Sequence, residues 1–311
     1  MRTGRYSGRG LLWLLVCMWS ATMAQTQVQV VTKTIEKELP YADGQPIRLM
    51  AQKSDVIVRG WNRPVVGIRL RLIAKHPDRA VAERELVYHQ YTLQATGTGL
   101  DLANRFVIPQ SAGKLKSQLK AVFEVNVPTR SQLTINDAFG DISLTEWAGE
   151  GSVSLEFGRL TLEEVGGRLT ITSEYADIDG RQVNAVLTGK TQKAEVSLRG
   201  LGGTVKLYCK YGKLVIWPNA ATLESLQVDA AGTDIMVIPK RIEEYQYGVL
   251  SVYSTVQVPD GFREFLKKKG VQQRFDWPAS GRKPPIKIDN EYSPVIIQPL
   301  SDTNASTGKK L

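Results

Sequence analysis

The chain has 311 residues, and its 40 basic and 31 acidic residues give a formal net charge of +9. It has two cysteines, of which only Cys209 lies outside the first 24 residues, so a chain that loses those residues has no internal disulfide. No segment after residue 24 is long and apolar enough to span a membrane as a helix.

Residues 1–24 are typical of a secretory signal peptide. Arg2, Arg5 and Arg9 form a basic start, an apolar run covers 11–16, and small residues end at Ala24, after which we expect cleavage. Lipidation at Cys17 is the alternative, although Val16 fits poorly before a lipid-bearing cysteine. Export would place the protein in the periplasm, on the outer-membrane surface or outside the cell, and it argues against nucleic acid as a partner. Cleavage would leave a formal net charge of 37 − 31, or +6. This charge either suits an anionic envelope polymer or simply keeps the chain soluble.

Residues 25–127 are predicted to form an α+β capping region. The expected elements are a strand over 25–39, a helix over 77–91, a hairpin around Gly97–Gly99 and a strand over 122–127. Residues 47–61 keep the apolar places, the small corner residue, the following Asp and the final Trp of residues 133–147. We therefore interpret 47–61 as a diverged coil of the architecture that follows.

Residues 133–218 form an internal repeat with a period of 18. Its signature is a corner pair, which recurs without insertion as Phe139-Gly140, Phe157-Gly158, Tyr175-Ala176, Lys193-Ala194 and Tyr211-Gly212. With Leu133 as the first place of a coil, apolar residues alternate at the first, third, tenth and twelfth places, as in strands with one buried face. The eighth place holds only Gly or Ala, so we expect this corner to accept a methyl group and nothing larger.

A coil of 18 residues cannot bury its own apolar face, whereas stacked coils can. The predicted fold class is all-β: a β-solenoid, or a flattened two-sheet roll, of stacked two-strand coils over residues 128–300 with the small N-terminal α+β cap.

Beyond residue 218 the period loosens. We expect variant coils over 226–238 and 247–258, a short amphipathic helix over 260–269, a last coil in phase over 286–297, and a disordered polar tail over 301–311.

The ninth place carries the charged residues considered for catalysis. It holds Asp141, Arg159, Asp177, Glu195 and Lys213 in successive coils. Adjacent acids such as Asp177 and Glu195 would lie near the roughly 5 Å separation of retaining glycosidases, but alternating signs also fit a solvated ionic ladder. We favour the ladder, and predict that Asp177 and Glu195 are structural.

The seventh place carries most of the aromatic residues of the repeat. Its members are Phe139, Phe157, Tyr175, Lys193 and Tyr211, with Tyr292 in the last coil. Such a column could offer a platform to sugars, but strand parity gives it the inward face, so we predict core packing at the corner. The same prediction applies to Trp61 and Trp147, which fall at equivalent turn positions.

No catalytic, cofactor or metal site is predicted. His76 and His89 have no ligand cluster near them in sequence, Cys209 is expected to pack as a small hydrophobe, and the chain lacks nucleophile-elbow, phosphate-loop and dinucleotide motifs.

Three segments carry a resemblance to a known family: residues 54–61 (SDVIVRGW), Val127-Pro128 leading into Phe139-Gly140-Asp141-Ile142, and residues 174–178 (EYADI). They resemble a bacterial putative-adhesin family with a β-solenoid domain of unknown function. Arg159, Glu195 and Lys213 depart from that family's small-acid-aliphatic pattern. The resemblance covers nearly all of the chain after residue 24 and implies a β-solenoid, with no catalytic residues to transfer.

Together these features predict an exported, non-enzymatic module that binds, adheres or acts as a scaffold at the cell envelope, with envelope polysaccharide or another envelope protein as partner. The alternatives are a polysaccharide-active hydrolase or lyase that uses acids on one face, and an accessory or sensor protein of an envelope-stress system.

Overall fold

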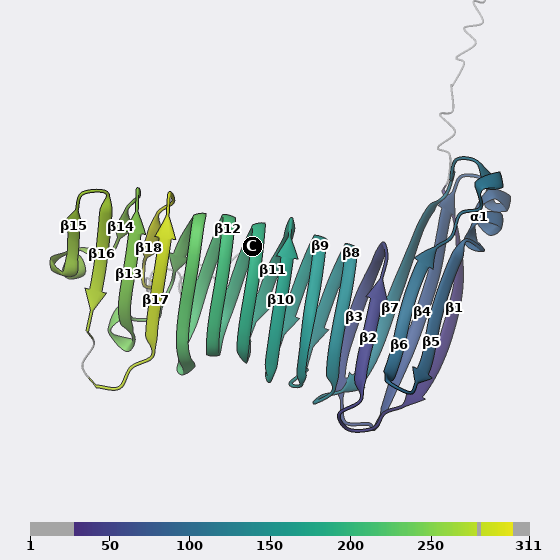
Figure 1. Ribbon diagram of the computed structural model, residues 1–311, viewed down its shortest axis with the longest axis horizontal. Helices are drawn as coiled ribbons and strands as arrows, with labels where there is room; N and C mark the ends of the chain where they lie inside the picture. Colours follow the sequence, from purple (N-terminus) through teal and green to yellow (C-terminus); the bar gives the residue numbers. More distant parts are fainter. Residues whose placement is uncertain (1–27, 279–280, 301–311) are drawn as a thin grey trace, which may run out of the picture.

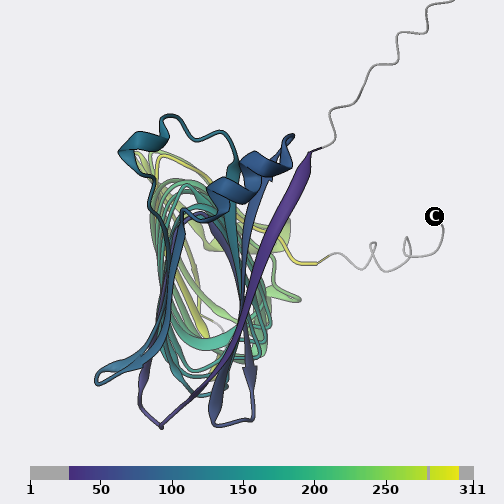
Figure 2. The same cartoon turned by 90° about the vertical axis from the view of Figure 1, so that its right-hand side faces the viewer.

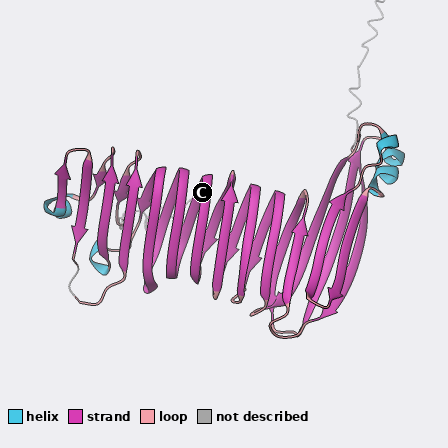
Figure 3. Ribbon diagram, viewed as in Figure 1, coloured by secondary structure: helices cyan, strands magenta, loops and turns pink. Residues whose placement is uncertain are grey.

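The computed structural model describes residues 28–278 and 281–300, and these form an all-β protein with little helix (Figure 3). The predicted signal peptide with its expected cleavage site after Ala24, Cys17 and the predicted tail over 301–311 lie outside the described residues. The strands are β1 (Gln29–Pro40), β2 (Pro46–Ala51), β3 (Ser54–Trp61), β4 (Val65–His76), β5 (His89–Thr96), β6 (Gly99–Phe106), β7 (Gln118–Pro128), β8 (Gln132–Thr145), β9 (Glu150–Glu163), β10 (Arg168–Glu174), β11 (Ala176–Arg181), β12 (Asn184–Val237), β13 (Gln246–Val252), β14 (Val256–Gln257), β15 (Leu266–Lys269), β16 (Gln272–Trp277), β17 (Pro285–Glu291) and β18 (Val295–Ile297). The helices are α1 (Arg79–Leu86) and the 3₁₀ turns η1 (Gln110–Ala112), η2 (Ile242–Glu244) and η3 (Asp260–Phe265).

The central strands pair in parallel with the 18-residue register that the sequence predicts. Leu133 pairs with Gly151 and Ile142 with Leu160 between β8 and β9, and Leu169 pairs with Leu187 between β10 and β12. Figure 1 shows these strands side by side along the long axis, and Figure 2, which looks along that axis, shows them superposed on two sides of a flattened ring. Each 18-residue turn of the chain thus adds one strand to each side.

The diverged coil predicted over 47–61 is confirmed. In β2, Ile47 pairs in parallel with Leu133, and in β3, Val56 pairs with Ile142, so both halves of this coil stack on β8 in the expected phase. On the opposite side of this coil, β6 pairs in parallel with β2, and β7 pairs in parallel with β3. The chain therefore leaves the stack after Trp61 and returns to it at β7.

The coils near the C-terminus do not stack in chain order. β17 pairs on one side with β12, where Leu226 meets Ile286, and on the other with β13, where Tyr247 meets Ile286. β18 is likewise joined to β12 and β14. The coil that comes last in the sequence is therefore inserted between two earlier ones.

Apolar side chains at the predicted inward places fill the space between the two sides. Residues at the first, third, tenth and twelfth places are buried, including Leu133, Ile135, Ile142 and Leu144 of the first repeat coil. The fifth place also points inward, and there the chain holds a mixture of polar and apolar residues, Asp137, Leu155, Ser173, Thr191 and Cys209. Trp147 is fully buried at the second turn, so core packing is confirmed for this residue.

The corner after each first strand of the repeat is made by a residue with positive φ, at the seventh place, at the eighth place or, in the Tyr211 coil, at both. Tyr175 and Lys193 take φ values of 56° and 52° at the seventh place, and the alanines after them have ordinary backbone. In the coils of Phe139 and Phe157 the following glycines turn the chain instead, with φ of 154° at Gly140 and 128° at Gly158. A Cβ at Gly158 would overlap the carbonyl oxygen of Gly140. The expectation that the whole eighth place accepts a methyl group is therefore wrong for the glycine coils.

Both ends of the stack are covered by antiparallel strands. At the N-terminal end β5 and β6 form the predicted hairpin around Gly97–Gly99, and β4 pairs with β7 and β1. Helix α1 is shorter than the 77–91 expected, because strand β5 already begins at His89. Its N-cap is Asp78, whose carboxylate accepts the N–H of Ala80 at 2.8 Å.

At the opposite end β16 and β15 pair antiparallel beyond β13. The helix predicted over 260–269 is instead the 3₁₀ turn η3 followed by β15, whose lysines Lys267 to Lys269 are exposed. A terminal strand with charged side chains resists pairing with another chain. None of the helices formed by the described residues has the length and apolar character needed to cross a membrane.

Candidate functional site: an exposed aromatic ladder and its groove

The seventh-place residues form a column along one corner of the stack, which we call the corner ladder. In stacking order it contains Lys53, Phe139, Phe157, Tyr175, Lys193, Tyr211, Gly232, Tyr292 and Tyr253. The aromatic members are 41–64% exposed. The prediction that they pack in the core is therefore wrong. Strand parity holds only while the backbone stays extended, and the chain leaves the extended conformation at this corner, at the tyrosines themselves or at the glycines that follow Phe139 and Phe157.

The rings of the corner ladder stack on one another. Phe139 and Phe157 have centroids 5.0 Å apart and planes within 4°, and Phe157 and Tyr175 are 5.2 Å apart and within 10°. Lys193 then covers the next face, with its Nζ 4.9 Å from the centroid of Tyr175 and 3.2 Å from its hydroxyl. In this part of the ladder neighbouring side chains cover the ring faces, so a partner meets mainly ring edges.

The ladder lacks a side chain at Gly232. This residue lies between Tyr211 on one side and Tyr292 on the other, and Tyr292 stacks on Tyr253 at 5.4 Å with planes within 3°. The ring of Tyr211 leans toward the gap, since its Cδ1 lies 2.8 Å from the position that a Cβ at Gly232 would take. One rung of the column is thus open.

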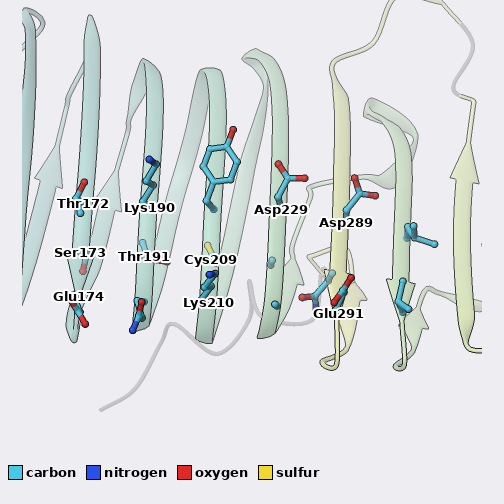
Figure 4. Close-up of a pocket in the computed structure, with 17 residues that line it drawn as sticks. Thr172, Ser173, Glu174, Lys190, Thr191, Cys209, Lys210, Asp229, Asp289 and Glu291 are labelled. Carbon is cyan, nitrogen blue, oxygen red and sulfur yellow. The ribbon is translucent and has the colours of Figure 1, made fainter.

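A groove of about 640 Å³ runs beside this part of the ladder. It is lined by residues at the fourth to sixth places of β10, β12, β17 and β13, which directly precede the ladder residues. Figure 4 shows Thr172, Lys190, Asp229 and Asp289 in one row across the strands, with the strand of Cys209 and Lys210 between those of Lys190 and Asp229, and Glu174, Lys210 and Glu291 in a second row. Ala230 and Ala231 form its floor next to Gly232, and Tyr208 adds a ring that is 42% exposed.

The charge of the groove differs in sign from that of the chain. Its lining has four carboxylates and two ammonium groups, in Glu174, Asp229, Asp289 and Glu291, and in Lys190 and Lys210. The groove is therefore locally acidic, although the whole sequence carries +9. This balance disfavours a polyanion in the groove and suits a ligand with many hydroxyl or amino donors.

Asp229 and Asp289 are the one adjacent acid pair of the groove lining, and sequence reasoning missed them. They are direct register partners on parallel strands, whose spacing is about 4.8 Å. Asp229 accepts a hydrogen bond from Gln227 at 3.0 Å, and Asp289 lies 3.3 Å from the ammonium group of Lys287. The sequence predicts a variant coil over 226–238 and a coil in phase over 286–297, but it does not indicate that the two are neighbours.

The ninth-place acids contact the backbone of the next coil. Asp141 accepts the N–H of Arg159 and Asp177 that of Glu195, each at 3.0 Å. Arg159 also lies 4.0 Å from the carboxylate of Asp177. These contacts agree with a structural ladder, and the absence of a catalytic role for Asp177 and Glu195 stays a prediction.

The remaining sequence candidates lie apart from the groove or in its floor. His89 is buried against the carbonyl of Ile73, and burial lowers its pKa, whereas the partly exposed His76 accepts the N–H of Asp78 in the turn before α1. The described residues contain no group of three metal-ligating side chains. Cys209 is buried in the groove floor, where burial raises its pKa as for an unreactive thiol. Trp61 is partly exposed beneath the guanidinium group of Arg63, so the core prediction holds for it only in part.

No protein-family profile matches the chain, and no curated protein matches it. Solved structures similar to it include a putative adhesin from Bacteroides fragilis (10% identity, TM-score 0.40, 97% of that chain) and a putative cell adhesion protein from Clostridium sporogenes (10%, 0.24, 100%). A third is a putative lipid binding protein from Parabacteroides distasonis (9%, 0.28, 97%). Each match covers 86% of the present chain. At these TM-scores the similarity does not identify a ligand.

Proposed function

We propose that the protein is an exported β-solenoid that acts at the cell envelope as a non-enzymatic binding module, and that its groove holds an envelope polysaccharide. The observation that supports this most directly is the groove itself, in which successive parallel strands present polar side chains at one spacing beside exposed aromatic residues. A polymer with a repeating unit can make the same kind of contact at successive rungs.

The chemistry of the lining supports a neutral or amino-sugar polymer. Carboxylates and ammonium groups form charge-assisted hydrogen bonds with hydroxyl groups, and an aromatic ring such as Tyr208 packs on the C–H face of a sugar. The acidic balance of the groove argues against an acidic polysaccharide as its ligand.

Binding can be measured by titration calorimetry with residues 25–311 and four probes: cellohexaose, maltohexaose, chitohexaose and an alginate oligosaccharide. We expect a neutral or amino-sugar hexasaccharide to bind, alginate not to bind, and Tyr208→Ala to weaken binding at least tenfold. Tyr91→Ala serves as the control, because Tyr91 is similarly exposed at 39% but lies on β5 in the cap. Failure of the wild-type chain to bind any probe would contradict the proposal.

A polysaccharide-active enzyme is the second candidate, and the pairing of Asp229 with Asp289 is the observation that favours it. Adjacent carboxylates on one sugar-binding surface are the arrangement that retaining glycosidases use. Incubation of the bound hexasaccharide with the protein, followed by mass analysis of the products, separates the two candidates. Intact hexasaccharide supports the binding module, whereas shorter products that disappear in the Asp229→Asn/Asp289→Asn variant would establish the enzyme.

A further inference from the structure

The open rung of the corner ladder has the dimensions of a slot for one ring. Tyr211 and Gly232 lie in successive coils of the long strand β12, and Tyr292 follows Gly232 in the next coil of the stack, so the two tyrosines are two strand spacings apart, or about 9.6 Å. A ring held between two others at van der Waals contact of about 3.5–4.0 Å on each face needs about 7–8 Å. Once the Tyr211 ring, which leans over Gly232, is turned upright, the gap has room for one ring and is too narrow for two.

The orientation of the slot follows from its neighbours. The planes of Tyr292 and Tyr253 are within 3° of parallel and their centroids are separated by about one strand spacing, so these rings lie across the long axis of the stack. Tyr292 has Tyr253 on one face and Gly232 toward the other. A ring that entered at Gly232 would continue the same column.

Tyr211 is able to admit such a ring. It is 59% exposed and leans over Gly232, where no side chain opposes it. Rotation about its side-chain bonds would bring it upright, as Tyr175 and Phe157 already stand in the ladder. The gap thus needs the movement of one exposed side chain and none of the backbone.

Polar side chains lie at the edges of the slot, and small residues form its floor. Ala231 precedes Gly232, and Glu291 is its register partner on the strand of Tyr292. Lys210 precedes Tyr211 on the opposite side, and both Lys210 and Glu291 line the groove. A ligand ring here therefore meets aromatic faces above and below and both an acceptor and a donor at its rim.

We propose that Tyr211, Gly232 and Tyr292 form a subsite that holds a single pyranose ring of the bound glycan. This proposal rests on the proposed function and names the place where binding is tightest. A pyranose fits because its two faces present C–H groups and its rim presents hydroxyls, the pattern that the slot complements. A planar heteroaromatic ring is thinner than a pyranose chair and has fewer donors for Glu291.

The subsite can be closed without a change of fold by Gly232→Tyr. Gly232 has φ of 62°, and Tyr175, Tyr211 and Tyr292 hold values of 56–64° at the same place, so a tyrosine is compatible with this backbone. The new ring would complete the ladder and occupy the slot. Titration calorimetry with the hexasaccharide probes should show at least a tenfold increase in Kd for Gly232→Tyr, with the wild-type melting temperature retained or raised.

Two truncations provide the matched comparison. Tyr292→Ala removes one wall of the slot and should also weaken binding at least tenfold, whereas Tyr253→Ala removes the ring behind that wall and should change Kd less than threefold. Equal binding by wild type and Gly232→Tyr would overturn the subsite while leaving the proposed function in place. A wild-type chain that binds no hexasaccharide overturns the proposed function itself. Binding of free tryptophan or adenosine, but of no hexasaccharide, would reassign the slot to planar aromatic ligands.

Discussion

Asp137 is a buried carboxyl group at the fifth, inward place of its coil. Only 4% of the residue is exposed, its Oδ1 accepts the N–H of Phe139 at 3.2 Å, and its Oδ2 is buried without a partner among the described residues. Burial raises its pKa from 3.8 to about 7, and the nearby carboxylate of Asp55 acts in the same direction. In other coils this place holds Ser173, Thr191 or Cys209, which carry no charge at neutral pH.

The raised pKa of Asp137 predicts that the protein loses stability as pH rises. The folded chain binds the proton more tightly than the unfolded chain, so the stabilising protonated form is lost between about pH 4 and pH 7. We expect the free energy of unfolding to fall by on the order of 2–3 kcal/mol from pH 5 to pH 8 through this group. Denaturant titrations of wild type and Asp137→Asn at both pH values test this.

The difference between the two proteins isolates Asp137 from other titrating groups such as His89. Asp137→Asn should lose less stability than wild type between pH 5 and pH 8. At pH 8 its free energy of unfolding should be higher than that of wild type. Parallel pH profiles for the two proteins would mean that the carboxylate of Asp137 is well solvated.

At the scale of one coil, the corner decides which substitutions the stack accepts. In the Phe157 coil the turn is made at Gly158 with φ of 128°, and in the Tyr175 coil it is made one residue earlier, with φ of 56° at Tyr175. Gly158 and Ala176 occupy the same place but have different backbone, and each faces the coil before it. The two positions therefore form a matched pair.

Gly158→Ala is predicted to destabilise the protein by at least about 2 kcal/mol, because the methyl group meets the backbone carbonyl of Gly140 and the φ is one that L-residues avoid. Ala176→Gly should cost about 1 kcal/mol or less, since it only adds flexibility and removes a buried methyl group. Denaturant unfolding of the two variants against wild type provides both values. Equal midpoints for Gly158→Ala and wild type would show that this corner is open.

The same corner shows where sequence reasoning succeeds and where it fails. The phase of the coils was predictable, because a one-residue slip would move residues such as Leu133 and Ile142 out of the core. The outward direction of Phe139, Phe157 and Tyr175 was not predictable, because the alternation of apolar residues does not show which residue adopts the left-handed conformation. The glycine and alanine at the eighth place indicated a tight turn but not which of two turns is made.

At the scale of the whole molecule, the proposed binding groove depends on a stacking order that the sequence does not reveal. The sequence shows that residues 286–297 form a coil. It does not show which coils lie on either side of them, because every coil in phase is an equally good partner. Only the insertion of β17 between β12 and β13 brings Asp289 beside Asp229 and Tyr292 beside Gly232. The helix predicted over 260–269 is wrong because the apolar residues that indicated it, Phe262 and Phe265, lie in the 3₁₀ turn η3. The lysine-bearing strand β15 begins directly after this turn.

The most direct test of the account is hydrogen–deuterium exchange of residues 25–311 with and without the hexasaccharide that binds. Because the groove brings together strand segments far apart in the sequence, we predict slower exchange together in the three segments around the proposed subsite, 208–211, 229–232 and 289–292. The hairpin of β5 and β6 in the cap should be unchanged. Protection confined to the cap, or spread along the ninth-place column and absent from these three segments, would contradict the assignment of the groove and its ladder as the binding site.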